Sequence, residues 1–404
     1  MSETTTTMGS INTPVAAHPT SRPGSLRPKR PAPAHTSTHQ PLRQRDWSRL
    51  SAVDTLAQYK PGKADPMRVL DVLLRLFNNQ HTARDKSVSH KTRQERADFL
   101  KRFFRDLTLR AGFKTLPDPR NLGQKHVHAM VLVWRQDKLK PATIQTYLSF
   151  LRGLAKWMGK PGFIRPPAFY GLEVEEYQRH EAAERDKSWS ARGIDIDVVI
   201  NQVCAYDAYV GASLRLIRAF GLRRKESVML RPYQCVVPFA ATGLPEEEKQ
   251  ADQYVWISQG AKNGRPRGIP LNSPERFAAI EFARTVAVGS DAHMGDPQYD
   301  LKHNLHRFGY VVAKFKITAK DLGVTAHGLR HEALIEEFVS RTGVQPPVRG
   351  GEALPTDVER KARVAVAALA GHCRTRVASA YLGQSRKDEG GKAASRAGLV
   401  EGGA

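Results

Sequence analysis

Apolar residues between positions 66 and 159 recur every three or four residues, the spacing that places them on one face of an α-helix. Pro66 favours the first turn of a helix over residues 66–77, because its ring fixes a helical φ angle. Ser89 predicts the N-cap of a second helix over residues 90–111, which turns phenylalanines and leucines inward. This part of the chain therefore begins as a helical domain.

Two further helices follow in the same region. Asn121 predicts the cap of a helix through Trp134, and Pro141 opens a last helix that stops before Gly159. We interpret residues 66–160 as a small four-helix bundle able to lie on DNA. The basic residues expected on its outer surface are Lys91, Arg93, Arg96, Lys101, Arg102 and Arg105. An ordinary bundle with solubilising side chains fits this surface equally well.

The second half of the chain mixes helical periodicity with two β-prone runs, so the predicted fold class is mainly α with a small β-hairpin or sheet. Asn263-Gly264 lies between the runs Tyr254–Ile257 and Gly268–Leu271, and an Asn-Gly pair in that setting is a strong hairpin signal. The helices expected here span about 195–209, 211–220, 273–287, 299–319, 327–341 and 357–370. A short structured stretch at about 374–383 follows them.

Composition marks the borders of these domains. Residues 1–48 are rich in Thr, Ser, Pro and Ala with several arginines, which predicts a disordered basic tail. Residues 161–190, with prolines and then glutamates, are typical of a linker into a second domain over residues 191–385. Residues 386–404 are rich in Gly, Ala and charge, which predicts a mobile C-terminal tail.

The charge balance narrows the partners of the chain. Its 404 residues include 63 Lys and Arg against 40 Asp and Glu, a formal net charge of +23. This favours an acidic polymer, nucleic acid before an anionic membrane. No run approaches the roughly 20 apolar residues that cross a bilayer, and residues 1–5 begin no signal-peptide core. We therefore expect a cytoplasmic, nucleoid-associated protein that binds double-stranded DNA and no membrane.

Metal and disulfide chemistry finds little support in the sequence. The three cysteines, Cys204, Cys235 and Cys373, are isolated and form neither a disulfide framework nor a Cys-x-x-Cys site. The pairs His126-x-His128 and His303-x-x-His306 fit polar positions on basic helices better than metal ligands. We expect no metal site and no cofactor.

His327 and Arg330 begin a segment with apolar positions at 334, 335 and 338. Residues three apart share one face of a helix, so the imidazole and the guanidinium point at one place. That place lies at a helix N-terminus, where an anion is favoured. Taken alone, the pair also fits two solvated side chains at the start of a surface helix.

Three more signals accompany this pair in a fixed order. The full set is Gly221-Leu222-Arg223 with Glu226, Lys262 in the hairpin loop, His327-Gly328-Leu329-Arg330-His331, and Gly371-His372 followed nine residues later by Tyr381. This order and these spacings resemble the tyrosine recombinases, the phage-integrase superfamily. The resemblance covers roughly residues 66–385. It implies an N-terminal helical core-binding (SAM-like) domain and a mixed α/β catalytic domain.

The chemistry of that family requires these residue types. Cutting a DNA phosphodiester without metal or water requires a protein nucleophile, and a tyrosine hydroxyl can form a phosphotyrosine. Because its ordinary pKa is about 10, it needs a cationic pocket. By resemblance and by this logic, Tyr381 attacks while Arg223 and Arg330 clamp the phosphate. Lys262 is the expected general acid, and His327 assists proton transfer.

His372 completes the expected site by hydrogen-bonding the phosphate. Arg223 has an alternative reading as a helix-start arginine paired with Glu226 for stability, and within the site Glu226 is expected to buttress it. His331 is expected to pack or to bind the backbone. The basic residues that compete with the hairpin lysine are Lys249, Arg265 and Arg267. The tyrosines that lack the motif are Tyr299 and Tyr310.

Two departures from the family pattern stand out. Ala370 occupies a position usually held by leucine, a small loss of packing volume. Arg330 and His372 are 42 residues apart, more than the family's usual spacing. The surplus maps to the Pro-, Gly- and Arg-rich residues 343–351, which we interpret as a surface insertion because loops tolerate added length.

The sequence thus predicts a site-specific DNA recombinase or integrase of a mobile genetic element, working through a 3′-phosphotyrosine. The resemblance implies a homotetramer on two DNA sites that passes through a Holliday junction. It also leaves room for an accessory DNA-bending or directionality factor. The rivals are a catalytically inactive DNA-binding protein of the same fold and a type IB-like topoisomerase. A metal-dependent nuclease would need clustered carboxylates, which the sequence does not show.

Overall fold

The structure, a computed structural model, describes residues 56–57, 59–60, 63–81 and 87–385. The tails expected at residues 1–48 and 386–404 lie outside them. The chain divides into two compact units, one up to Tyr177 and one from Gln178 onward. Within the described ranges no helix is both long and apolar enough to cross a membrane.

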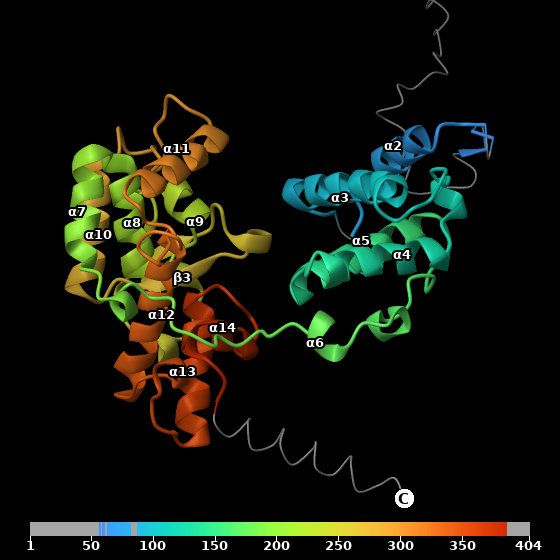
Figure 1. The fold of residues 1–404 in the computed structure, drawn as a ribbon. Helices are drawn as coiled ribbons and strands as arrows, with labels where there is room; N and C mark the ends of the chain where they lie inside the picture. The colour runs from blue at the N-terminus through green and yellow to red at the C-terminus, as the bar shows by residue number, and fades with distance from the viewer. Residues whose placement is uncertain (1–55, 58, 61–62, 82–86, 386–404) are drawn as a thin grey trace, which may run out of the picture. The chain divides into compact units, whose positions relative to one another are not determined.

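The first unit is a bundle of four main helices, as the periodicity predicts (Figure 1). The helices are α2 (Pro66–Phe77), α3 (His90–Leu109), α4 (Gln124–Gln136) and α5 (Pro141–Trp157), followed by the short α6 (Val174–Tyr177). Their apolar faces share one core that includes the stacked rings of Phe99 and Tyr147, 4.3 Å apart. Ser89 caps α3 as expected, because its hydroxyl accepts a hydrogen bond from the Thr92 N–H at 3.2 Å.

The cap predicted for α4 is wrong. Asn121 ends a 3₁₀ turn, η3 (Pro119–Asn121), and the N-cap of α4 is Gly123. The His126 Nδ1 accepts the Gly123 N–H at 2.8 Å, so a side chain from inside the first turn satisfies this donor. Asn121 was favoured on residue type alone, whereas the local backbone places the cap two residues later.

Arg96 is a second correction, because it does not belong to the outer basic surface of α3. Its side chain is buried and donates to Asn78 Oδ1 at 2.7 Å and to the Asn78 carbonyl at 2.8 Å. The guanidinium also lies over the ring of Trp157, 4.9 Å from its centre. Burial lowers the Arg96 pKa to about 10. Arg96 therefore fastens the end of α2 to α3 and α5, since its flat, multidentate group satisfies several buried acceptors at once.

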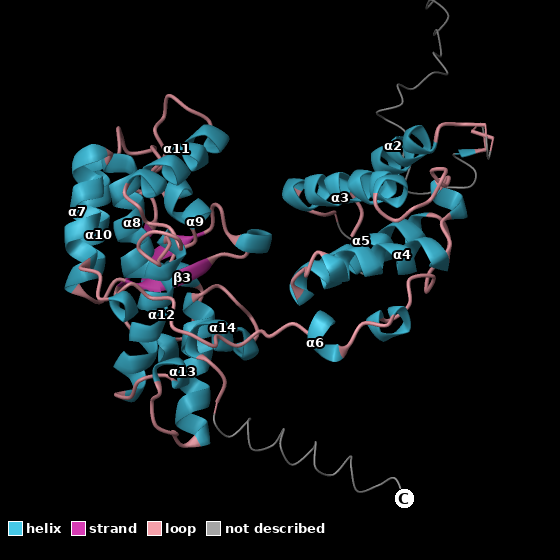
Figure 2. Ribbon diagram, viewed as in Figure 1, coloured by secondary structure: helices cyan, strands magenta, loops and turns pink. Residues whose placement is uncertain are grey.

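The second unit combines helices with one small sheet (Figure 2). Its helices are α7 (Ile196–Tyr206), α8 (Ala208–Phe220), α9 (Arg224–Met229), α10 (Pro274–Val286), α11 (Leu301–Lys314), α12 (Ala326–Thr342), α13 (Thr356–Leu369) and α14 (Ser379–Leu382). Its strands are β1 (Val236–Pro238), β2 (Gln253–Ile257) and β3 (Arg267–Pro270). The fold class is therefore mainly α with a small sheet, as predicted.

The sheet is antiparallel in the order β1-β2-β3. The predicted β2–β3 hairpin is confirmed, with Val255 opposite Ile269 and Ile257 opposite Arg267. Its loop is longer than a two-residue turn and contains a 3₁₀ turn, η8 (Lys262–Gly264). β1 was not predicted, because three residues are too few to show an alternating pattern.

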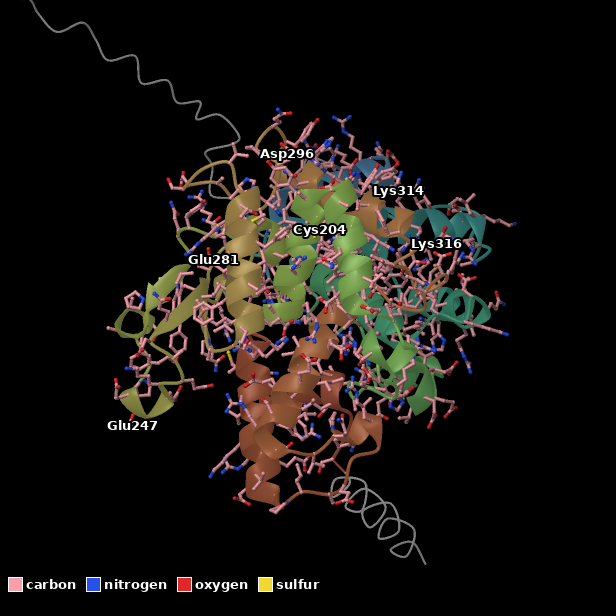
Figure 3. The ribbon with its side chains drawn as sticks, turned by 90° about the vertical axis from the view of Figure 1, so that its left-hand side faces the viewer. Cys204, Glu247, Glu281, Asp296, Lys314 and Lys316 are labelled. Atoms are coloured by element: carbon pink, nitrogen blue, oxygen red, sulfur yellow. The ribbon has the colours of Figure 1, made fainter. Side chains whose placement is uncertain are left out.

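Helix α8 lies at the centre of the second unit and packs against α7, α10 and α12. It approaches α7 so closely at Gly211 that a Cβ there would lie 2.4 Å from the Sγ of Cys204, which Figure 3 places on α7. Asp207 separates α7 from α8 and caps α8 by accepting the Val210 N–H at 3.1 Å. Helix α11 ends at Lys314, earlier than predicted, because the chain turns at Lys316 with a φ of 59°.

The segment expected as a linker, residues 161–190, is divided between the two units. The 3₁₀ turn η4 (Pro167–Tyr170) belongs to the first unit, where Tyr170 donates a hydrogen bond to Gln124 at 3.0 Å. At the other end Trp189 is fully buried in the core of the second unit. Its indole N–H donates to the Thr325 carbonyl at 2.9 Å, directly before α12.

Candidate active site

The six residues predicted for the site come from five places in the second unit. Arg223 directly precedes α9, after a left-handed turn at Gly221 that ends α8. His327 and Arg330 lie in the first turns of α12, as their spacing predicts. The remaining three are Lys262 on η8, His372 after α13, and Tyr381 on α14.

Arg330 holds the hydroxyl of Tyr381. Its Nε donates to Tyr381 Oη at 3.2 Å, and its Nη2 donates to the Ala370 carbonyl at 2.7 Å. Its Nη1 donates to the Gly221 carbonyl. The side chain is fully buried, and the guanidinium carbon lies 5.6 Å from the centre of the Tyr381 ring. The arginine of α12 and the tyrosine of α14 are thus assembled within one chain.

Arg223 binds at the same turn as Arg330. Its Nη2 donates to the Ala370 carbonyl at 2.9 Å and lies 3.1 Å from His372 Nε2. Both arginines therefore share the Ala370 carbonyl, at the turn where leucine is usual in the family. Arg223 Nη1 donates to Glu226 at 2.7 Å, so Glu226 buttresses Arg223 as expected.

A third arginine, Arg267, was missed as a structural member of this site. It is buried on β3 and donates from both Nη atoms to the Glu226 carboxylate, at 3.1 Å and 2.8 Å. Burial alone would raise the pKa of Glu226, but hydrogen bonds and charge from Arg267, with help from Arg223, lower it to about 2. The predicted strand began at Gly268, one residue too late, whereas β3 begins at Arg267 and places Arg267 and Ile269 on the same buried face.

The histidines of the site are held neutral at neutral pH. Burial, followed by the charges of Arg223, Arg330 and Lys262, lowers the pKa of His372 to about 4. Desolvation and the charges of Arg330 and Arg223 lower the pKa of His327 to about 4. The side chain of His327 stays exposed, so solvent screens part of that effect. A neutral imidazole keeps one ring nitrogen as an acceptor, and the neighbouring cations make it a weak base.

His331 packs at this site, which agrees with its expected role. Its ring lies 4.9 Å from that of Tyr381 and 5.2 Å from that of His327. The side chain is buried, and its Nδ1 has no hydrogen-bond partner among the described residues. Burial lowers its pKa to about 3. His331 therefore packs against the tyrosine ring as a buried, neutral side chain.

Lys262 is close to the site without being bonded to it. It is exposed on η8, and within the described part of the chain no hydrogen bond joins it to the other five predicted residues. Its charge nevertheless contributes to the low pKa of His372. Arg265, from the same loop, contacts Cys373 Sγ directly after His372. The hairpin loop therefore lies near one side of the pocket, where a long side chain can reach inward.

The competing tyrosines lie elsewhere in the second unit. The exposed fraction of Tyr299 is 43% and that of Tyr310 is 62%, against 7% for Tyr381. Tyr299 precedes α11 and stacks on His303 at 4.0 Å. Tyr381 alone among these three contacts an arginine of the predicted set.

Comparison with protein families identifies both units. The model described as "Phage integrase, N-terminal" matches residues 75–163, and the model described as "Integrase" matches residues 185–334. Together the two matches cover more than half of the chain and include Arg223, Lys262 and Arg330. The chain belongs to the tyrosine recombinase family. A comparison with curated proteins gives no match.

Several solved structures of recombinases are similar to this protein. A lambda integrase (75–356) dimer bound to a COC′ core site has 14% identity and a TM-score of 0.48, over 78% of this chain and 94% of that one. The Tn1549 transposon integrase with transposon right end DNA has 14% identity and a TM-score of 0.46, over 77% and 95%. XerH recombinase bound to its difH substrate has 12% identity and a TM-score of 0.45, over 84% and 86%.

In this tyrosine recombinase the pocket gathers positive charge. Arg223 and Arg330 converge on the Ala370 carbonyl, and Arg330 also donates to the Tyr381 hydroxyl. Glu226 is the one carboxylate within ion-pair distance of these two arginines in the described residues, and Arg267 shares it. The local charge therefore stays positive, which favours a bound anion.

Proposed function

We propose that the protein is a site-specific recombinase or integrase that cuts and rejoins double-stranded DNA through a 3′-phosphotyrosine. The observation that carries this proposal is the Tyr381 hydroxyl, 3.2 Å from the Nε of Arg330 in a pocket that also contains Arg223. A hydroxyl beside two permanent cations is favoured as a nucleophile toward a phosphodiester, because both the phenolate and the phosphate gain from the same charges.

The proposed cleavage step balances as follows. The Tyr381 oxygen forms a bond to phosphorus while the bond from phosphorus to the 5′ oxygen breaks. The tyrosine proton passes to the neutral imidazole of His327, and the leaving 5′ oxygen takes a proton from Lys262. Arg223 and Arg330 stabilise the charge on the non-bridging oxygens, each such donor contributing about 3–4 kcal/mol.

The reverse reaction seals the DNA. Attack by another 5′-hydroxyl on the phosphotyrosine restores a phosphodiester without ATP, because the covalent intermediate keeps the energy of the broken bond. We assign to His372, which lies 3.1 Å from Arg223, a hydrogen bond to the phosphate in both directions. Attack by a hydroxyl from a second DNA site exchanges strands, which makes the enzyme a recombinase.

The partners proposed are two double-stranded DNA sites and further copies of this chain in a tetramer. Membership in the family supports this assembly, and the net charge of +23 supports binding to a polyanion. A recombination assay with two sites separates this function from relaxation of one DNA by a topoisomerase-like enzyme. Joined products from two sites are expected.

The covalent step is tested with a nicked DNA substrate, from which the short cleaved strand diffuses away and leaves the adduct trapped. We expect the wild type to form an adduct in EDTA and Tyr381→Phe to form none. Tyr299→Phe, at an exposed tyrosine outside the site, is the matched control and is expected to keep adduct formation. An adduct that survives Tyr381→Phe contradicts the proposal.

A further inference from the structure

The residues read from the sequence as a surface insertion, 343–351, are packed into the second unit. They contain a 3₁₀ turn, η9 (Pro347–Arg349), and Pro346 before it is buried. Gly351 closes the turn so tightly that a Cβ there would lie 1.6 Å from the Gln345 carbonyl oxygen. Gly343, Gln345 and Gly350 are exposed, so the segment lies at the surface, but it is an ordered turn that packs on the second unit through Pro346 and Arg349.

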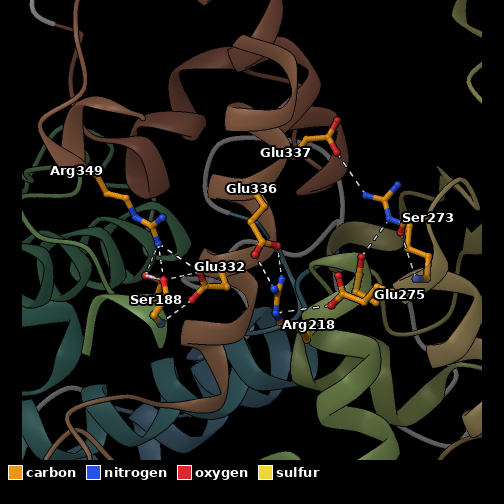
Figure 4. Close-up of polar contacts among 11 residues, drawn as sticks. Ser188, Arg218, Ser273, Glu275, Glu332, Glu336, Glu337 and Arg349 are labelled. Carbon is orange, nitrogen blue, oxygen red and sulfur yellow. Dashed lines mark hydrogen bonds and ion pairs between the residues drawn. The ribbon is translucent and has the colours of Figure 1, made fainter. Parts of the chain in front are cut away.

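Arg349 is the centre of this packing (Figure 4). Its Nε donates to Asp186 at 2.6 Å, and its Nη2 donates to the hydroxyls of Ser188 at 2.9 Å and Ser190 at 2.8 Å. The same Nη2 lies 3.3 Å from the Glu332 carboxylate. Asp186, Ser188 and Ser190 all belong to the segment through which the chain enters the second unit.

Glu332 joins this cluster to the active site. It lies on α12 two residues after Arg330, and only 2% of its surface is exposed. Besides Arg349, its carboxylate accepts the Ser190 N–H at 2.9 Å and the Ser190 hydroxyl at 2.6 Å. The entering segment, the turn η9 and the helix of the clamping arginine therefore share one buried carboxylate.

The turn η9 also supports the helix of the nucleophile. Gly383, two residues after Tyr381, lies against Val348 so closely that a Cβ on Gly383 would be 2.9 Å from the Val348 nitrogen. The Ala183 N–H, from the entering segment, donates to the Ser379 carbonyl at 2.8 Å. The nucleophile helix thus contacts both η9 and the entering segment, and Arg349 binds these two supports together.

We propose that Arg349 is a positioning residue for Tyr381, which it places by fastening η9 to residues 186–190 of the entering segment, because η9 and that segment both contact α14. This inference rests on the proposed function. Arg349 touches none of the reacting atoms, and its effect passes through Val348 to Gly383 and through Glu332 to α12. The insertion therefore serves the chemistry of its own chain.

The charges explain why an arginine is needed. Arg349 faces two carboxylates, Asp186 and Glu332, whose side chains are 10% and 3% exposed. A planar fork reaches both carboxylates and two hydroxyls at once, and a lysine ammonium can satisfy only part of this set. Without the cation, two largely buried carboxylates lose their partner, so the turn is expected to shift away from α14.

The test measures adduct formation on nicked DNA at saturating protein, in single turnovers, together with DNA affinity. Arg349→Gln is expected to slow adduct formation by about tenfold or more, since a displacement of about 1 Å of a reacting group can cost about a hundredfold. DNA affinity is expected to stay within about twofold, because Arg349 binds protein carboxylates and no phosphate. Arg349→Lys is expected to recover part of the rate.

Two further variants guard against simple unfolding. Ser190→Ala removes one hydroxyl from the cluster and keeps its charges balanced, so a folded protein with a smaller loss of rate is expected. Arg341→Gln is the matched control, because Arg341 pairs with Glu337 at 2.6 Å on α12 and makes no contact with the cluster. Its adduct rate is expected to equal that of the wild type.

A sulfur-substituted substrate separates positioning from acid catalysis. When sulfur replaces the bridging 5′ oxygen, the leaving thiolate needs no proton, so Lys262→Ala is expected to regain its rate. Arg349→Gln is expected to remain slow, because its defect concerns the nucleophile. Wild-type rates in both Ser190→Ala and Arg349→Gln, or rescue of Arg349→Gln by sulfur, overturn this inference. Absence of any adduct in the wild type contradicts the proposed function instead.

Discussion

Three arginines of the candidate site surround one carboxylate. Glu226 is fully buried, accepts hydrogen bonds from Arg223 and Arg267, and lies 3.9 Å from Arg330. Glu226 therefore helps to orient Arg223, one of the two arginines proposed to clamp the phosphate. It also lowers the repulsion between cations that the pocket gathers before any DNA is bound.

Replacement of this carboxylate tests its role. Glu226→Gln is expected to lower the free energy of unfolding by about 3–5 kcal/mol, because buried cations lose their partner. Denaturant unfolding of the full chain measures this change. Glu281→Gln, which breaks an exposed pair with Arg284, is the control and is expected to change stability by less than about 1 kcal/mol. Equal effects of the two substitutions contradict the role given to Glu226.

Stability should depend on pH through His331. Its pKa is about 3 in the fold and 6.5 without the fold, so below pH 6.5 the unfolded chain binds a proton that the folded protein excludes. The free energy of unfolding therefore falls as pH is lowered from 7 to 5, by up to about 2 kcal/mol from this group. His331→Gln is expected to show a shallower fall in denaturant unfolding at these pH values. An identical slope in wild type and variant contradicts this assignment.

At the scale of elements, the turn after α13 brings the two arginines together. Ala370 offers its carbonyl to both Arg223 and Arg330, and Gly371 follows with a φ of 66°. A Cβ on Gly371 would lie 2.9 Å from Nη1 of Arg267, whose two bonds to Glu226 prevent it from moving aside freely. The turn therefore needs glycine for two separate reasons.

Two glycine substitutions separate these reasons. Gly371→Ala and Gly343→Ala both add about 1–2 kcal/mol of backbone strain, because each glycine has a left-handed φ. Only Gly371→Ala also displaces Arg267, since nothing lies within 4 Å of a Cβ at Gly343. Gly371→Ala is expected to lose more stability in denaturant unfolding and to slow adduct formation, whereas Gly343→Ala keeps the rate. Equal rates in the two variants contradict the crowding at Arg267.

The helices and strands also show which features of the fold local sequence patterns can predict. Helices α2, α3 and α5 and the β2–β3 hairpin were predicted because their caps, prolines and periodicities are local signals. The members of the site were predicted as a set from motif order, and their mutual contacts were not. The Ala370 carbonyl binds Arg330, which is 40 positions away in the sequence, and Arg223, which is 147 positions away. No periodicity in the sequence encodes such contacts.

Three errors share a physical cause. Arg96 was placed outside by residue type, but the carbonyls at the end of α2 needed a donor. Residues 343–351 were interpreted as a surface insertion, and the pairing of Arg349 with distant carboxylates was missed. Arg267 was weighed only as a rival general acid. In each case a tertiary partner, absent from the local sequence, decides where an arginine lies.

At the scale of the whole molecule, charge governs the encounter with DNA. The net charge of +23 is spread over both units, and several exposed basic residues lie on α3 of the first. A protein that neutralises many phosphates releases counterions, so its affinity falls steeply with salt. Two compact units on one chain enlarge the number of phosphates that a single protomer can contact.

Salt dependence measures this contribution. DNA affinity is expected to fall by about a thousandfold between 50 and 200 mM salt, the range for roughly six or more phosphate contacts. Fluorescence anisotropy with a labelled duplex provides the measurement, with an unrelated duplex of equal length as the comparison for specificity. A fall of less than about tenfold indicates few phosphate contacts and contradicts a mode of binding dominated by the backbone.

The central claim is that Tyr381 itself becomes bonded to the DNA phosphate. The trapped adduct is digested with trypsin and nuclease, and the modified peptide is sequenced by mass spectrometry. We predict a phosphate-linked fragment on the peptide Val377–Arg386, which contains Tyr381 as its one tyrosine. A nucleotide attached to any other residue, or an adduct mapped to the first unit, contradicts the account.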